Sequence, residues 1–246
     1  MRGFEMEQKI LELINDAEMV LIGIGTEFSP QTPQYDTLEA YRRSSYYEEL
    51  PDDCEQIRAY NKLRSLVGAK PYFVVTLNTD DLIYRSAFED DLIVAPCGSM
   101  AKLQCGEHIV EADEIRRSVL NAGDERLAVC PECGKPLQFH TIEAENYMEQ
   151  EYLPMWEKYK KWLQCTLNRR LCILELGVGF QYPQVIRWPF EKIAMYNQKA
   201  HLIRVSAKFP QLAEELSQKG VSVPEHPVQF LLKAGDESEK KLQMDG

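Results

Sequence analysis

The sequence is poor in basic residues and contains no long apolar run. Lys and Arg number 28 against 39 Asp and Glu, which gives the 246-residue chain a formal net charge of -11. No Lys/Arg cluster falls on an expected helix, so a general nucleic-acid surface and binding to anionic membranes are not expected. No stretch approaches the roughly 20 apolar residues of a membrane-spanning helix, and the segment from Met1 to Glu5 does not begin a signal peptide. We therefore expect a cytoplasmic protein with no nucleic-acid or membrane partner.

A disulfide framework is also not expected. The seven cysteines are an odd number, and Cys130 and Cys133 form a Cys-x2-Cys pair, which favours metal binding. Cys105 and His108 have the same spacing upstream, so the four residues predict a tetrahedral Cys3His zinc site. Because all four ligands come from the protein, the zinc is expected to be structural. His140 is the alternative fourth ligand, and reduced thiols without a metal are the other interpretation.

Short β-branched apolar runs alternate with amphipathic segments along the chain. Strands are expected at 19–22, 72–76, 92–95, 171–176 and 201–206, and helices at 5–16, 147–168, 184–198 and 209–219. Strands that alternate with helices predict an α/β fold with a mostly parallel sheet.

Polar and glycine residues follow several of these strands. Asn78 and Asp80 come directly after the run 72–76, and ligands bind at the carboxyl ends of strands in open α/β sheets. A Gly-x-Gly turn follows two other strands, at residues 23–25 and 177–179, and such turns allow the backbone to approach a phosphate closely. Either turn alone is also compatible with plain tight-turn geometry, since the third glycine of a dinucleotide fingerprint is missing. Two such turns in one sheet favour a nucleotide site.

Together these motifs resemble the sirtuin family, over most of the chain from Met19 to Ser206. The stretches that carry the resemblance are Gly23-Ile24-Gly25, Leu77-Asn78-Thr79-Asp80, Cys97-Gly98, Cys105/His108 with Cys130/Cys133, Gly177-Val178-Gly179 and Val205-Ser206. The resemblance implies a Rossmann-type NAD-binding domain built from residues 1–30, 68–100 and 165–235. A helical insert (31–67) and a zinc-binding insert (101–145) would form the small domain, followed by a flexible tail (236–246).

The resemblance also implies which residues bind NAD and which act in catalysis. The implied cofactor-binding residues are Gly23, Ile24, Gly25, Glu27, Tyr35, Asn78, Asp80, Gly177, Val178, Gly179 and Ser206. The implied catalytic positions are Asn78, Asp80 and Cys97.

Three departures from the sirtuin pattern limit what the resemblance implies. Cys97 stands where sirtuins have the His that acts as base, Leu77 replaces a Gln, and Asp36 replaces the Arg of the cofactor loop. A Cys at that position either acts as a thiolate or is a small buried hydrophobe. Standard lysine deacetylation is therefore not expected. We expect instead an NAD-consuming enzyme that cleaves NAD or transfers ADP-ribose to an acceptor, such as a protein. The alternative is a catalytically silent module that binds NAD or ADP-ribose and acts through a partner.

Overall fold

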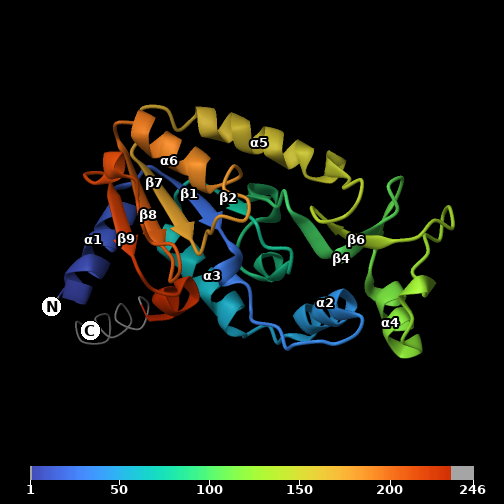
Figure 1. The fold of residues 1–246 in the computed structure, drawn as a ribbon. Coiled ribbons are helices and arrows are strands. Elements are labelled where there is room, and N and C mark those ends of the chain that lie inside the picture. The colour runs from blue at the N-terminus through green and yellow to red at the C-terminus, as the bar shows by residue number, and fades with distance from the viewer. Residues whose placement is uncertain (1, 234–246) are drawn as a thin grey trace.

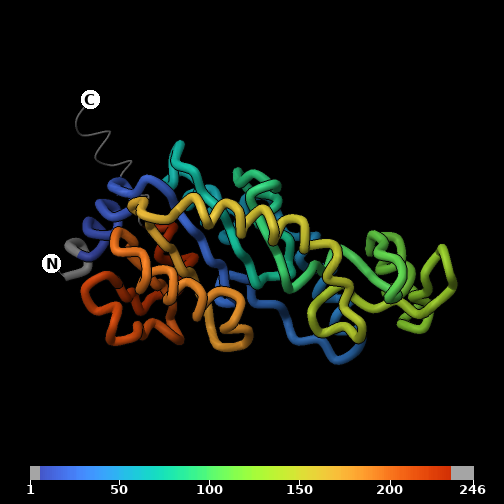
Figure 2. The backbone as a smooth tube through the Cα atoms, turned by 90° about the horizontal axis from the view of Figure 1, so that it is seen from above, coloured from blue at the N-terminus to red at the C-terminus, as the bar shows by residue number. Residues whose placement is uncertain are grey.

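The computed structural model describes residues 2–233, so the expected tail at 236–246 lies outside the described residues. Figure 1 shows a large part built around one sheet and a smaller part that holds α2 (Glu39–Glu49), α4 (Asp113–Ala122) and a second sheet. Seen from above, in Figure 2, the two parts follow one another along the long axis of the molecule. In the part of the chain that is described, no helix has the length and apolar character needed to cross a membrane.

The large sheet confirms the predicted fold class. It has six strands in the order β3-β2-β1-β7-β8-β9, and all neighbouring strands are parallel. The strands are β1 (Met19–Ile24), β2 (Tyr72–Thr76), β3 (Ile93–Val94), β7 (Leu171–Leu176), β8 (Ala200–Val205) and β9 (Gly220–Val223). The chain order reverses between the adjacent strands β1 and β7, and in open α/β sheets ligands bind near the carboxyl ends of strands at such a switch point.

Helices cover both faces of the large sheet, which explains why its strands are apolar throughout. Alternate residues of β1 point to opposite faces. Ile22 packs in a core with helices α1 (Arg2–Asp16) and α3 (Glu55–Val67), whereas Leu21 packs in a core with α5 (Leu153–Gln164) and α6 (Arg187–Tyr196). Both cores continue along the neighbouring strands, so the sheet has no solvated face near its centre.

The smaller part has its own antiparallel sheet and core. The strand order is β5-β4-β6, with β4 (Gly98–Gln104) in the centre between β5 (Ile109–Glu111) and β6 (Gln138–Thr141). Leu103, Val119 and Phe139 pack together with Tyr41 of α2.

Short 3-10 helices connect elements throughout the described part of the chain: η1 (Thr26–Phe28), η2 (Leu82–Arg85), η3 (Asp90–Leu92), η4 (Glu125–Leu127), η5 (Glu149–Glu151) and η6 (Glu214–Leu216).

Three differences from the expected elements have physical reasons. The helix expected at 209–219 is wrong: the segment is irregular except for η6 and the turn after it, and buried arginines bind the carbonyls of Phe209 and Gln211. The edge strand β9 was not expected, and its run of four residues is too short to stand out from a loop. The helix expected from 147 begins only at Leu153, with Pro at the start where its missing N–H costs nothing. A final helical segment occupies residues 227–233.

Candidate functional site

The turns that follow β1, β7 and β8 contact one another at the carboxyl edge of the large sheet. The Gly25 amide donates to the Leu176 carbonyl (2.8 Å), the Glu27 amide donates to the Gly177 carbonyl (3.2 Å), and the Gly177 amide donates to the Val205 carbonyl (2.7 Å). The two Gly-x-Gly turns and the end of β8 are therefore joined by backbone hydrogen bonds. Ile24 and Val178 bury their side chains completely in the two cores, so only their backbone is available to a ligand.

The glycines of the first turn are required by the packing of the protein on itself. A Cβ atom on Gly25 would lie 2.2 Å from the Gly177 carbonyl oxygen and 2.3 Å from the Val178 Cα atom. A Cβ atom on Gly23 would lie 2.6 Å from Ile186 and 2.7 Å from Phe190, at the base of α6. These distances explain the Gly-x-Gly pattern as close turn–turn and helix–sheet contact, one of the known uses of such glycines.

Glu27 links the turn after β1 to the turn after β8. Its carboxylate accepts hydrogen bonds from the Ser206 hydroxyl (2.9 Å) and from the amides of Ala207 (2.8 Å) and Lys208 (3.0 Å). Ser206 in turn accepts a hydrogen bond from the Phe209 amide (2.9 Å). The structure thus brings together Glu27 and Ser206, which lie far apart in the sequence and were both expected at the cofactor.

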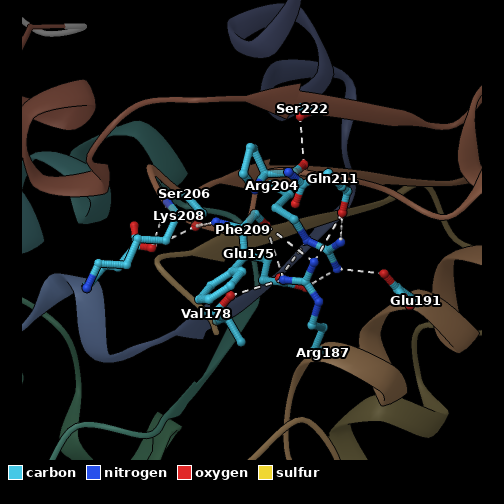
Figure 3. Close-up of polar contacts among 12 residues, drawn as sticks. Glu175, Val178, Arg187, Glu191, Arg204, Ser206, Lys208, Phe209, Gln211 and Ser222 are labelled. Carbon is cyan, nitrogen blue, oxygen red and sulfur yellow. Dashed lines mark hydrogen bonds and ion pairs between the residues drawn. The ribbon is translucent and has the colours of Figure 1, made fainter. Parts of the chain in front are cut away.

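A buried network of charged residues supports the turn that follows β8 (Figure 3). Arg204 of β8 is fully buried and donates to both carboxylate oxygens of Glu175 in β7, at 2.6 and 2.9 Å, and to Glu191 of α6 at 2.8 Å. Arg187 lies 3.5 Å from Glu175 and donates to the carbonyls of Val178 (3.1 Å) and Phe209 (3.2 Å). The two arginines balance the two glutamates, and they hold the turns that follow β7 and β8.

Asn78 and Asp80 lie at the end of β2, as expected, and both are almost fully buried. Asp80 accepts hydrogen bonds from the Ser29 hydroxyl (2.6 Å) and the Leu82 amide (3.1 Å), while burial raises the pKa of its carboxyl. The Asn78 amide nitrogen faces the Tyr60 hydroxyl at 3.5 Å. The side-chain oxygen of Asn78, Oδ1, is buried and has no hydrogen-bond partner among the described residues. A buried acceptor without a donor costs about 1–3 kcal/mol, so this position suits a ligand that donates a hydrogen bond.

A cavity of about 510 Å³ lies between the sheet edge and the smaller part of the molecule. Asn78, Ser29 and Cys97 line it from the large sheet side, and Arg43, Glu125 and Gln138 line it from the smaller part. Of the residues implied to bind the cofactor or to act in catalysis, only Asn78 and Cys97 line this cavity, and Asp80 and the half-buried Tyr35 do not. Glu143 and Tyr182 also line the cavity, and they could not be predicted from the sequence because no local motif marks them.

Cys97 has the properties of a buried apolar side chain. Its exposed fraction is 1%, and burial, followed by the charge of Glu143, raises the pKa of its thiol to about 12. A thiol with this pKa is protonated at neutral pH and does not accept a proton. Of the two interpretations of Cys97, the structure favours the small buried hydrophobe.

The four predicted zinc ligands come together at one point. The Cys105 sulfur lies 3.6 Å from the Cys133 sulfur and 3.7 Å from His108 Nδ1, and the Cys130 sulfur lies 3.7 Å from the same nitrogen. A tetrahedral zinc with bonds of about 2.0–2.3 Å places its ligand atoms roughly 3.4–3.8 Å apart, so the donor set fits this metal. His140 is elsewhere: it is buried, with Nδ1 2.7 Å from Gln104 and Nε2 3.0 Å from Glu151.

The surroundings of the cysteine–histidine cluster are also organised for a metal. His108 Nε2 faces Glu132 at 3.3 Å, and a partner on the second ring nitrogen orients a ligating imidazole. Gly106 and Gly134 have φ angles of 86° and 71°, which glycine adopts readily in the tight turns that expose sulfur atoms. An ion pair between Lys135 and Glu107 connects the two halves of the cluster.

Two known proteins are similar to this chain in sequence. No protein-family model matches the chain. The Protein ADP-ribosyltransferase of Staphylococcus aureus (strain Mu50 / ATCC 700699) is 23% identical over 180 residues, which cover 68% of this chain and 57% of that protein. A probable bifunctional ADP-ribose hydrolase/ADP-ribosyltransferase of Fusarium oxysporum f. sp. cubense is 26% identical over 152 residues, 54% of this chain and 25% of that protein. This chain therefore spans less than two thirds of either relative.

Solved sirtuins match nearly the whole chain in structure. A sirtuin studied for its substrate affinity has a TM-score of 0.64 at 13% identity, covering 94% of this chain and 98% of its own. A Sir2 enzyme studied for its mechanism and regulation has a TM-score of 0.63 at 18% identity, with coverages of 96% and 98%. A Sir2 structure that contains NAD and a p53 peptide has a TM-score of 0.59 at 13% identity, with coverages of 94% and 98%. The chain has the sirtuin fold.

Proposed function

We propose that this protein is an NAD-dependent enzyme that transfers ADP-ribose to an acceptor, and that it is not a standard lysine deacetylase. The single observation that carries the proposal is the cavity at the carboxyl edge of the large sheet, where Asn78 presents an unpaired buried acceptor while Cys97 offers no base. The names of the two curated relatives, both ADP-ribosyltransferases, support the same reaction.

Two places along the carboxyl edge of the large sheet suit the two ends of NAD. Asn78 and Asp80 would hold the nicotinamide end, since a carboxamide oxygen and a carboxylate accept hydrogen bonds from the nicotinamide amide and the ribose hydroxyls. The adenosine end would lie against the backbone of residues 23–25 and 177–179, with Glu27 and Ser206 close to the ribose. Cleavage of the glycosidic bond passes through an oxocarbenium-like ribose, which requires positioning and charge stabilisation.

Zinc would be held by Cys105, His108, Cys130 and Cys133, where it stabilises the fold of the smaller part. With four protein ligands it has no open coordination position for substrate. We therefore assign the chemistry to the cavity and a structural role to the metal.

A second candidate is a silent module that binds NAD or ADP-ribose for a partner protein. The protonated thiol at Cys97 and the apolar side chain at Leu77 favour it, because both positions carry polar residues in the sirtuin pattern. Nicotinamide release separates the two candidates, since only the enzyme breaks the glycosidic bond.

Calorimetry with NAD and ADP-ribose on the unaltered protein and on Asp80→Asn tests the placement of the two ends. We expect both ligands to bind the unaltered protein, and the variant to lose far more affinity for NAD than for ADP-ribose, which lacks nicotinamide. An equal loss of both ligands would mean that the nicotinamide end is placed wrongly. No binding of either ligand by the unaltered protein would refute the proposed function.

A further inference from the structure

The cavity requires a group that accepts a proton, and Cys97 is not that group. When an acceptor with an O–H or N–H bond attacks the ribose, its proton must be transferred to a base. Burial raises the pKa of the Cys97 thiol to about 12, so the thiol is protonated and does not accept that proton. The base must therefore come from another element that reaches the same part of the cavity.

The turn that follows β6 is fastened directly beside Cys97. Thr141, the last residue of β6, pairs with Gly98 of β4. The next amide, that of Ile142, donates to the Cys97 carbonyl at 3.0 Å, and the Ala144 amide closes the turn by donating to the Thr141 carbonyl at 2.9 Å. Gly98 allows this approach, because a Cβ atom there would lie 2.1 Å from the His140 carbonyl oxygen. These bonds fix the position of Glu143, the third residue of the turn.

Glu143 lines the cavity, and its carboxylate is available to accept a proton. It lines the cavity together with Cys97, Asn78 and Tyr182. After burial, its negative charge is the next cause that raises the pKa of both the Cys97 thiol and the Tyr182 phenol, which places the carboxylate near both groups. Among the described residues Glu143 has no hydrogen-bond or ion-pair partner, and it is exposed, so an accepted proton can pass to solvent.

The other carboxylate that lines the cavity from the smaller part is less suitable. Glu125 lies in η4, and its charge acts on Tyr41 of the smaller part's own core, where it raises the pKa of that phenol after burial. Among the described residues no hydrogen bond joins Glu125 to Cys97, whereas the Ile142 amide, in the turn of Glu143, donates to the Cys97 carbonyl. Glu143 is therefore the carboxylate of the cavity that is held beside Cys97.

We propose that Glu143 is the catalytic base that activates the acceptor of ADP-ribose, in place of the imidazole that the sirtuin pattern has at the position of Cys97. The inference rests on the proposed function. The bond between the ribose C1′ and the nicotinamide nitrogen breaks, and its electron pair leaves with neutral nicotinamide. The acceptor oxygen or nitrogen forms a bond to C1′, and its proton passes to the Glu143 carboxylate and then to solvent. With water as acceptor the product is ADP-ribose.

Chemical rescue tests this role. Nicotinamide release from NAD is measured with the protein in excess, in buffer with and without sodium azide. Glu143→Gln should lower release into water by about 100- to 10,000-fold, the usual contribution of a general base. Azide is an anionic nucleophile with no proton to lose, so it should restore release in this variant and give ADP-ribosyl azide. Glu143→Asp keeps a carboxylate and should retain more activity than Glu143→Gln.

The matched control is Glu145→Gln, two residues further along the same exposed loop and outside the cavity lining, which should behave as the unaltered protein. Unchanged release by Glu143→Gln would overturn the inference, as would a loss that azide does not restore while NAD still binds. Equal activity of the Asp and Gln variants would also overturn it. A protein that binds no NAD, or that releases no nicotinamide under either condition, would instead refute the proposed function itself.

Discussion

Removal of Arg204 should be the most destabilising single change in the large sheet. The Arg204 guanidinium and the Glu175 carboxylate are both fully buried, with two bonds of 2.6 and 2.9 Å between them. Arg204→Met leaves Glu175 and Glu191 with Arg187 as the one remaining cation of the network, and Arg187 is 3.5 Å from Glu175. An ion pair broken by loss of one buried partner costs about 3–5 kcal/mol. That cost is a large share of the roughly 5–15 kcal/mol that stabilises a folded protein.

Urea unfolding followed by circular dichroism measures this cost. With m near 2–3 kcal/mol/M, the Arg204→Met midpoint should fall by about 1–2.5 M. The double variant Glu175→Met/Arg204→Met should regain most of the loss, because it removes the uncompensated charge and leaves Arg187 with Glu191. As a surface control, Arg169→Met removes an exposed partner of Glu18 and should leave the midpoint unchanged. A double variant no more stable than Arg204→Met would show that the buried charge is not the source of the loss.

Three further outcomes follow from the structure. Purified protein should contain about one zinc per chain by elemental analysis, and Cys130→Ser should lose it, whereas Cys165→Ser, at an exposed cysteine outside the cluster, should retain it. Gly25→Ala should yield little folded protein because its Cβ atom would meet backbone at 2.2 Å, whereas Gly179→Ala, with its nearest contact at 3.4 Å, should fold normally; normal expression of both would contradict the close turn contact. Burial raises the pKa of Asp81 to about 6, so the folded state retains a proton that the unfolded state loses near pH 4. The free energy of unfolding should therefore fall as the pH rises from about 4 to 6, and Asp81→Asn should reduce this dependence.

The strands and the zinc quartet were predictable because each leaves a local signal in the sequence. Central parallel strands such as 72–76 and 171–176 are apolar on both faces, so they stand out as continuous runs. The pairs Cys105/His108 and Cys130/Cys133 show the spacing that a tight ligand turn imposes, and the structure brings all four together. Order and spacing along the chain were sufficient in both cases.

The rest depends on contacts between residues far apart in the sequence. The bond from Ser206 to Glu27 spans 179 positions, and the pairing of Glu175 with Arg204 places two charges inside strands that read as apolar. The glycine pattern predicted a close approach, and Gly25 makes one with the backbone of the neighbouring turn, whereas an approach to a phosphate stays a prediction. Glu143 carried no signal at all, because only the pairing of β6 with β4 places it beside Cys97.

The most direct test of the central claim is to incubate the purified protein with NAD that carries a radiolabel in its adenylate phosphate. Separation of the products follows the label and the nicotinamide in the same sample. The account predicts that nicotinamide appears in equal amount to labelled ADP-ribose, counted as free ADP-ribose plus label attached to protein. Recovery of intact NAD from a protein that binds it tightly would contradict the account and identify a silent binding module.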